Sequence, residues 1–282
     1  VSLGDLSYDI HIAPGRLDDT GKLCQQVLPR ATRLAVVTDD TVGGLYAHRL
    51  LQSLWARGYT ASVISLPAGE QTKSLHNLGV LYDSFMEMGL TRTDAVVALG
   101  GGVVGDLAGF AAATILRGVD FVQVPTTLLA QVDSSVGGKV AIDLPAGKNL
   151  AGAFWQPRLV VMDPEVLDTL EDKTFSDGMA EVIKYGCIWD RSLFDLLAAL
   201  KNRQGIMAHI EDITLRCCDI KRQVVEQDEH DTGLRMLLNF GHTLGHVYEK
   251  AYHYETYTHG EAVAAGMVAA ARIGSRLGVT PA

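Results

Sequence analysis

The sequence predicts an α/β protein, with a Rossmann-like parallel-sheet domain at the N-terminus and an α-helical domain after it. In the first half, short apolar stretches alternate with segments of helical periodicity, a pattern typical of βαβ units and a largely parallel sheet. A glycine-rich segment at 100–105 stands between one such stretch and the helical segment after it. Beyond Asp163 and Pro164 helical periodicity dominates. We therefore predict an α/β domain over residues 1–163 and a helical domain over 164–282.

The elements of the first domain follow from short apolar runs and from helical spacing. Runs rich in apolar and β-branched residues predict strands at 34–38, 61–66, 95–99 and 121–124, of which 95–99 is expected to be buried. Apolar residues at helical spacing predict helices at 41–57, 74–88 and 103–116. The alternation of strands and helices implies a largely parallel sheet.

The second domain begins where Asp163 precedes Pro164, because Asp is a favourable N-cap and proline suits the first helical position. Long helical candidates follow at 190–199 and 206–227. The sequence contains no apparent internal repeat or low-complexity linker. In a chain with two such domains, we expect the active site to lie in the cleft between them.

The composition is that of an acidic globular protein. Its 282 residues, 48% hydrophobic and 20% charged, suffice for one large or two moderate cores. The formal net charge of −9 argues against a general surface for nucleic acid or anionic membranes, so we expect a small anionic partner held by locally gathered cations. The longest weakly polar run, 95–116, contains Asp106 and several glycines and therefore does not predict a membrane span.

The four cysteines indicate a reducing compartment. Cys24, Cys187, Cys217 and Cys218 show no CxxC spacing, and two adjacent cysteines make a poor structural disulfide. The first residues carry no basic region followed by an apolar stretch, so no secretory signal is visible. We therefore expect a cytoplasmic protein.

The segment from Gly100 to Gly105 satisfies the GxGxxG pattern between a predicted strand and a predicted helix. Backbone N–H groups at such a turn can bind the pyrophosphate of a dinucleotide. Asp120, at about the spacing expected for a ribose contact, precedes its strand and does not reproduce the usual geometry. Asp39, directly after the first predicted strand, is the better candidate. A glycine-rich tight turn without a ligand is the alternative.

Histidines and a glutamate in the second domain indicate a catalytic divalent metal. His242 and His246 lie four residues apart, on one face if the segment is helical, and His259 follows after a short polar turn. Glu181 adds a carboxylate. Three protein ligands would leave a coordination position open for substrate. Each histidine alone also fits an ordinary interior or surface residue, so the inference depends on their clustering with an upstream glycine-rich loop.

Basic residues recur beside glycine, asparagine or these candidate ligands, although the whole chain is acidic. They are Arg117, Lys139, Lys148, Lys184, Lys221 and Arg235. Gathered cations can hold phosphate and carboxylate groups, whereas a single lysine is usually just solvated. Asp133, in the segment 132–139, is similarly ambiguous, because Asp, Ser and Gly also build turns.

Several motifs together resemble the 3-dehydroquinate synthase family of the sugar phosphate cyclases, across essentially the whole chain. The motifs lie at 67–73, 100–106, 117–119, 124–139, 178–186, 239–246 and 259–261. The resemblance implies that Glu181, His242 and His259 bind zinc or cobalt. It also implies that His246 faces the substrate, in place of the ligand pair that the spacing suggested.

The resemblance further implies an NAD site, a substrate site and a dimer. NAD contacts are implied for Asp39, Glu70, Lys73, Gly101, Gly102, Asp106, Thr126, Thr127, Lys139, Lys148 and Thr169. Catalytic roles are implied for Asp133, Lys139, Lys184, Lys221, Arg235, Asn239 and His246. Further substrate contacts are implied for Arg117, Lys148 and Asn149. Arg117 would reach across the interface of a homodimer.

By this resemblance the chain is a carbon–oxygen lyase of the shikimate pathway of aromatic amino acid biosynthesis. The substrate would be 3-deoxy-D-arabino-heptulosonate 7-phosphate, and the products 3-dehydroquinate and phosphate. NAD would be reduced and regenerated within one turnover. Nucleic acid and membranes are not expected partners.

Three alternatives stay open. Another sugar phosphate cyclase would act on a substrate without the carboxylate, which Lys221, Arg235 and Asn239 together disfavour. A metal-dependent polyol dehydrogenase of related architecture would release NADH, but a simple polyol offers these basic residues no phosphate or carboxylate. Family members normally continue past the equivalent of Ala282, with more helix and a further basic residue, so an inactive truncated remnant is the third alternative.

Overall fold

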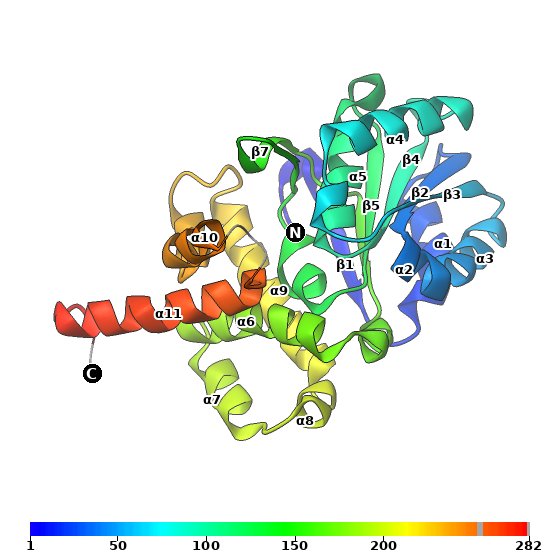
Figure 1. Ribbon diagram of the computed structural model, residues 1–282. Coiled ribbons are helices and arrows are strands. Elements are labelled where there is room, and N and C mark those ends of the chain that lie inside the picture. Colours follow the sequence, from blue (N-terminus) through cyan, green and yellow to red (C-terminus); the bar gives the residue numbers. More distant parts are fainter. Residues whose placement is uncertain (253–255, 281–282) are drawn as a thin grey trace. The chain divides into compact units, whose positions relative to one another are not determined.

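The computed structural model describes residues 1–252 and 256–280, which form two compact units, Val1–Thr169 and Leu170–Ala282 (Figure 1). The first unit is α/β and the second is helical, as the sequence predicts. The division falls after Thr169, whereas the predicted boundary follows Asp163. The reason is that the 3₁₀-helix Pro164–Thr169 packs on the first unit, where Val166 joins the core and the Tyr46 hydroxyl donates to the Val166 carbonyl at 3.1 Å.

One six-stranded parallel sheet organises the first unit, in the order β1-β8-β5-β4-β2-β3. The strands are β1 (Asp9–Ile12), β2 (Arg33–Asp39), β3 (Thr60–Leu66), β4 (Ala95–Gly100), β5 (Asp120–Pro125) and β8 (Leu159–Met162). The four strands predicted from sequence are β2, β3, β4 and β5. β1 and β8 were not predicted.

Both faces of this sheet are covered, which explains why its central strands are almost entirely apolar. In β2, Leu34 and Val36 belong to one core while Ala35 and Val37 belong to the other, as the two-residue period of a strand requires. Every residue of β4 is buried. The loops that follow these strands are therefore anchored to strands that are buried between two hydrophobic cores.

Helices pack on each face of the sheet (Figure 1). They are α1 (Arg16–Val27), α2 (Asp40–Val42), α3 (His48–Trp55), α4 (Leu75–Glu87) and α5 (Gly102–Thr114). α1 and α3 supply leucines to the core on one face, and α4 and α5 supply leucines and alanines to the core on the other. Ser74 caps α4 by accepting a hydrogen bond from the backbone N–H of Asn77.

An antiparallel hairpin, absent from the sequence-based prediction, follows the sheet's fifth strand in the chain. It consists of β6 (Lys139–Leu144) and β7 (Gly147–Phe154). The hairpin packs on α5, where a Cβ atom at Gly109 would lie 2.4 Å from a methyl group of Val140. Only glycine permits this approach.

The second unit consists of helices. They are α6 (Asp172–Ile188), α7 (Arg191–Ala199), α8 (Arg203–Met207), α9 (Ile210–Gln227), the 3₁₀-helix Leu234–Asn239, α10 (His242–Ala251) and α11 (His259–Arg276). The single helix predicted at 206–227 is wrong, because the backbone of His209 is non-helical and separates α8 from α9. In the part of the chain that the structure describes, no helix is both long and apolar enough to cross a membrane.

Glycines allow α6, α10 and α11 to approach each other closely. A Cβ atom at Gly260 would lie 2.3 Å from the backbone oxygen of Asp177 in α6. At Gly266 it would lie 2.0 Å from the carbonyl oxygen of Gly241, at the start of α10. The first turn of α11 is also tied to α6 by a 2.5 Å hydrogen bond from the Gly260 N–H to the Asp177 carboxylate.

This contact predicts that Gly260→Ala destabilises the protein, because the added methyl group must push α11 away from α6. We expect a loss of about 1–3 kcal/mol in the free energy of unfolding, measured by chemical denaturation. Gly79→Ala is the matched control, because Gly79 lies inside α4 with no atom within 4 Å of an added Cβ, and it should gain about 0.4–1 kcal/mol. A Gly260→Ala protein as stable as wild type would contradict the close packing.

Candidate active site

The glycine-rich loop lies at the carboxyl edge of the sheet, between β4 and α5. β2 and β4 are neighbours, yet the chain leaves β2 toward β3 on one side and β4 toward β5 on the other. This is a topological switch point, where open α/β sheets bind ligands. Asp39 ends β2 at the same edge, and its carboxylate accepts a 2.9 Å hydrogen bond from the Val42 N–H. The sequence-predicted loop and its candidate ribose residue therefore meet at one edge.

Side chains after β5 close on this loop. A Cβ atom at Gly101 would lie 2.9 Å from the methyl group of Thr127, so only glycine fits there. The Thr126 N–H donates to the carbonyl of Gly100 at 3.0 Å, which fixes the two turns together. Gly102 opens α5, whose first N–H groups lie at this edge.

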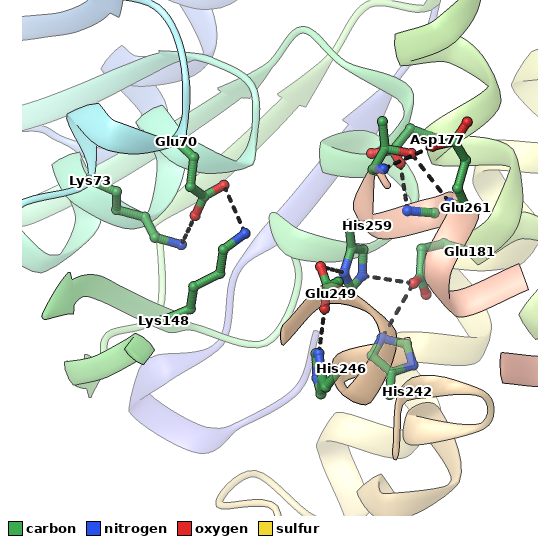
Figure 2. Close-up of polar contacts among 12 residues, drawn as sticks. Glu70, Lys73, Lys148, Asp177, Glu181, His242, His246, Glu249, His259 and Glu261 are labelled. Atoms are coloured by element: carbon green, nitrogen blue, oxygen red, sulfur yellow. Dashed lines mark hydrogen bonds and ion pairs between the residues drawn. The ribbon is translucent and has the colours of Figure 1, made fainter. Parts of the chain in front are cut away.

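Asp106, in the helix that follows the loop, belongs to a cluster of opposite charges, of which Figure 2 shows Glu70, Lys73 and Lys148. Buried Lys73 places its Nζ 3.0 Å from Asp106 and 3.3 Å from Glu70, and the Lys148 Nζ lies 3.8 Å from Glu70. Burial acts to lower the pKa of Lys73, but the carboxylates of Asp106 and Glu70 outweigh it and raise the pKa. Lys73 therefore keeps its positive charge at neutral pH.

The hairpin forms one wall of a pocket of about 480 Å³, lined among others by Asp106, Lys139, Asn149 and Phe154. Asp143 stands at an irregularity in the hairpin ladder, and its backbone N–H donates to the Lys73 carbonyl at 2.8 Å. The Asp143 carboxylate accepts a 2.8 Å hydrogen bond from the backbone N–H of Asn149, which has a left-handed φ of 56°. Asp143 thus joins the hairpin to the charged cluster.

Three further predicted residues of the first unit lie in separate settings. Arg117 is exposed in a left-handed turn, with a φ of 69°. Asp133 is half-buried in the short π-helix Ala130–Ser134. Thr169 ends the 3₁₀-helix after β8, with its hydroxyl 2.7 Å from that of Tyr46.

In the second unit, Glu181, His242 and His259 converge from α6, α10 and α11 (Figure 2). One ligand atom from each lies within 4.8 Å of the other two. The Glu181 Oε1 is 3.4 Å from the Nε2 atom of each histidine, and Glu181 itself is 0% exposed. A carboxylate and two imidazoles at this spacing are a donor set suited to a divalent metal ion.

The Nδ1 atoms of His242 and His259 each have a partner that orients the ring. The His242 Nδ1 lies 3.4 Å from the Phe240 carbonyl, and the His259 Nδ1 lies 3.5 Å from the Glu249 carboxylate. Each ring therefore directs its Nε2 toward Glu181, as metal-binding histidines with a second partner do. Burial acts to lower the pKa of His259, but Glu181 and Glu249 raise it to about 10. The carboxylates thus favour positive charge at this position, so the donor set fits a cation.

His246 lies outside this ligand set. Its side chain is 62% exposed, and its Nδ1 contacts the Glu249 carboxylate at 2.7 Å. The ligand pair suggested by the four-residue spacing is therefore not formed, because His246 is held by Glu249 while His242 is directed at Glu181. Burial acts to raise the pKa of Glu249, but hydrogen bonds from His246 and His259 lower it to about 2.

Buried basic residues occupy the same unit. Lys184, one turn after Glu181, contacts its carboxylate, and Lys221 lies buried in α9. Arg235 is also buried, with its guanidinium donating to the Glu229 carbonyl at 2.7 Å and its backbone N–H donating to Asp228. Hydrogen bonds from the backbone N–H groups of Thr232 and Arg235 lower the pKa of Asp228, which keeps the Asp228 carboxylate ionised. Asn239 is exposed at the end of the 3₁₀-helix.

Sequence reasoning overlooked two acidic residues of these sites, Glu249 and Asp143. Glu249 could have been found, because it lies three residues after His246 and seven after His242, on the same helical face. Asp143 gave no such signal, since its role depends on a hairpin that the sequence pattern did not indicate.

Two family models cover most of the chain. Residues 63–177 match the model described as 3-dehydroquinate synthase N-terminal, and residues 178–282 match the one described as 3-dehydroquinate synthase C-terminal. The 3-dehydroquinate synthase of Clostridium beijerinckii is 51% identical over 280 residues, which are 99% of this chain and 80% of that protein.

Solved structures with a similar fold carry NAD and a metal. A 2-deoxy-scyllo-inosose synthase complexed with carbaglucose-6-phosphate, NAD⁺ and Co²⁺ superposes with a TM-score of 0.85 at 27% identity, over 97% of this chain and 74% of that one. The 2-epi-5-epi-valiolone synthase of Streptomyces hygroscopicus subsp. jinggangensis, with NAD⁺ and Zn²⁺ bound, gives 0.85 and 27%, over 99% and 77%.

The geometry predicts different effects for the two helix-α10 histidines. His242→Ala should remove a ligand and with it most of the bound metal, whereas His246→Ala should retain the metal, because His246 contacts Glu249 rather than the ligand atoms. Metal content of the purified variants, measured after loading with cobalt or zinc, provides the check. Equal metal loss from both variants would instead support a His242–His246 ligand pair.

Proposed function

The chain belongs to the 3-dehydroquinate synthase family, and from this membership we propose that it converts 3-deoxy-D-arabino-heptulosonate 7-phosphate to 3-dehydroquinate and phosphate. The reaction is a carbon–oxygen lyase step of the shikimate pathway. The observation that carries the proposal is the convergence of Glu181, His242 and His259 beside buried Lys184. A metal donor set beside a buried cation suits a substrate that carries both hydroxyls and anionic groups.

Glu181, His242 and His259 would hold the divalent ion, zinc or cobalt. When bound, the ion supplies Lewis acidity toward substrate hydroxyl oxygens. Phe240 and Glu249 would keep the two imidazoles in the ligating orientation through the contacts at Nδ1.

Residues at the carboxyl edge of the sheet would hold NAD. When bound, NAD supplies a hydride acceptor that is regenerated before product leaves. Gly101 and Gly102 would bring backbone N–H groups to the pyrophosphate at the start of α5, and Asp39 would bind the ribose. The remaining proposed contacts come from Glu70, Lys73, Asp106, Thr126, Thr127, Lys139, Lys148 and Thr169.

Basic and polar residues would bind the substrate. We assign Lys221, Arg235 and Asn239 to the carboxylate, because a guanidinium offers paired donors to two oxygens. Arg117, Lys139, Lys148, Asn149 and Lys184 complete the proposed set of contacts. His246 and Asp133 would exchange protons or hydrogen bonds with the substrate, and the exposure of His246 suits that role.

We also propose a homodimer, in which the exposed Arg117 contributes to the partner's site, and a cytoplasmic location. All four cysteines are free thiols, and Cys24, Cys217 and Cys218 are buried. Free thiols accord with a reducing compartment.

The proposed reaction makes a kinetic prediction. Because the nicotinamide is reduced and reoxidised within one turnover, the heptulosonate phosphate with NAD and cobalt should release phosphate without accumulating NADH. Phosphate and NADH absorbance are followed in the same assay, with the metal-free protein as control. Stoichiometric NADH accumulation would support a polyol dehydrogenase instead, and the absence of both signals from metal-loaded protein would support an inactive form.

Arg235→Lys tests carboxylate recognition. Lysine keeps the charge but loses the paired donors, so kcat/KM for the heptulosonate phosphate should fall by a factor that corresponds to about 1–3 kcal/mol. An analogue with hydroxymethyl in place of the carboxylate should lose much less. Equal losses for both compounds, with metal content and folding intact, would refute this role and favour another sugar phosphate cyclase.

A further inference from the structure

One carboxylate, that of Glu249, contacts two imidazoles at once (Figure 2). Its Oε2 lies 2.7 Å from the Nδ1 of His246, and its Oε1 lies 3.5 Å from the Nδ1 of His259. Glu249 is only 4% exposed, although it lies on α10, the same helix as the largely exposed His246. Both oxygens of a buried carboxylate are thus engaged with the two rings.

The Nε2 atoms of His246 and His259 face different surroundings. The Nε2 of His259 lies 3.4 Å from Glu181, within the proposed ligand set. His246 is held at Nδ1, so its Nε2 is the nitrogen left for a substrate in the exposed part of the site. Fixing one nitrogen of an imidazole determines which way the other nitrogen points and which tautomer it adopts.

We propose that Glu249 is a positioning residue that orients the metal-ligating His259 and the substrate-facing His246 together, and so couples metal binding to the placement of the proton-transferring imidazole. Its effect on the metal follows from the contacts alone. Its effect on catalysis through His246 rests on the proposed function.

Asp177 of α6 serves as a control for Glu249, because its carboxylate also contacts the start of α11. Its carboxylate also holds the first turn of α11, but through the backbone N–H of Gly260 at 2.5 Å rather than through an imidazole. A carboxylate that only fastens helices together should therefore behave like Asp177. A carboxylate that orients ligands should change the metal site itself.

The first experiment titrates apoprotein with Co²⁺ in wild type, Glu249→Gln and Asp177→Asn. Glutamine keeps the size of Glu249, but its amide nitrogen cannot accept a hydrogen bond, so one of the two rings loses its acceptor. We expect Glu249→Gln to bind cobalt about 10–100-fold more weakly and to alter the visible absorption of the bound ion. Asp177→Asn should leave that absorption unchanged, even if it melts at a lower temperature. Wild-type affinity and absorption in a folded Glu249→Gln protein would overturn the proposal.

A second variant keeps the test decisive if Glu249→Gln does not fold. Glu249→Asp retains the charge, but its side chain is one methylene shorter and cannot span both rings without movement. It should show the same direction of change in cobalt affinity and absorption. Wild-type behaviour in a folded Glu249→Asp protein would count against the bridging role.

Kinetics at saturating cobalt test whether Glu249 also acts on catalysis through His246. Glu249→Gln should lower kcat for phosphate release, and in a His246→Ala background the same substitution should cause a smaller further loss, because part of its effect acts through His246. Additive losses would overturn the coupling to His246. If wild type releases no phosphate at all, the proposed function fails, while the cobalt titration still decides whether Glu249 positions the metal ligand.

Discussion

The packing of α6, α10 and α11 in the second unit depends on the buried carboxylate of Glu181. Glu181 is inaccessible to solvent, and its neighbours are Lys184 on its own helix and the imidazoles of His242 and His259. A charge in such a place is strongly unfavourable unless cationic or metal partners surround it. The three helices that carry these partners must therefore meet closely, and the glycines at their contacts allow them to do so. These contacts place a donor set that an apolar core could not provide.

In the first unit, the buried sheet determines where polar groups can lie. The central strands are buried on both faces, so polar groups accumulate where those strands end. At that edge the strand order reverses, and the glycine-rich turn, Asp39 and the charged cluster around Lys73 gather there. The hairpin extends the cluster through Asp143, which binds backbone on both sides. The candidate site residues of this unit therefore lie mainly in the turns and loops at the edge of a buried sheet.

Carboxylates control the orientation of the functional groups in both units. Glu249 holds two imidazoles, Asp228 holds the turn before Arg235, and Asp106 with Glu70 holds Lys73. This explains how an acidic chain can present cations to an anionic substrate. These carboxylates hold positively charged groups in place, so the cations are locally concentrated although the net charge is negative.

The sequence by itself determined the fold class, four of the six sheet strands and the place of the glycine-rich turn, because apolar runs and strand-to-helix alternation leave local patterns. The clustering of Glu181, His242, His246 and His259 suggested a metal site from the sequence, and motif resemblance then moved His246 from the ligands to the substrate side. Only the tertiary structure decided that His246 turns to Glu249, that the hairpin brings Asp143 to Lys73, and that the boundary falls after Thr169. These depend on contacts between residues far apart in the chain, and a periodicity over a few residues contains no information about such contacts.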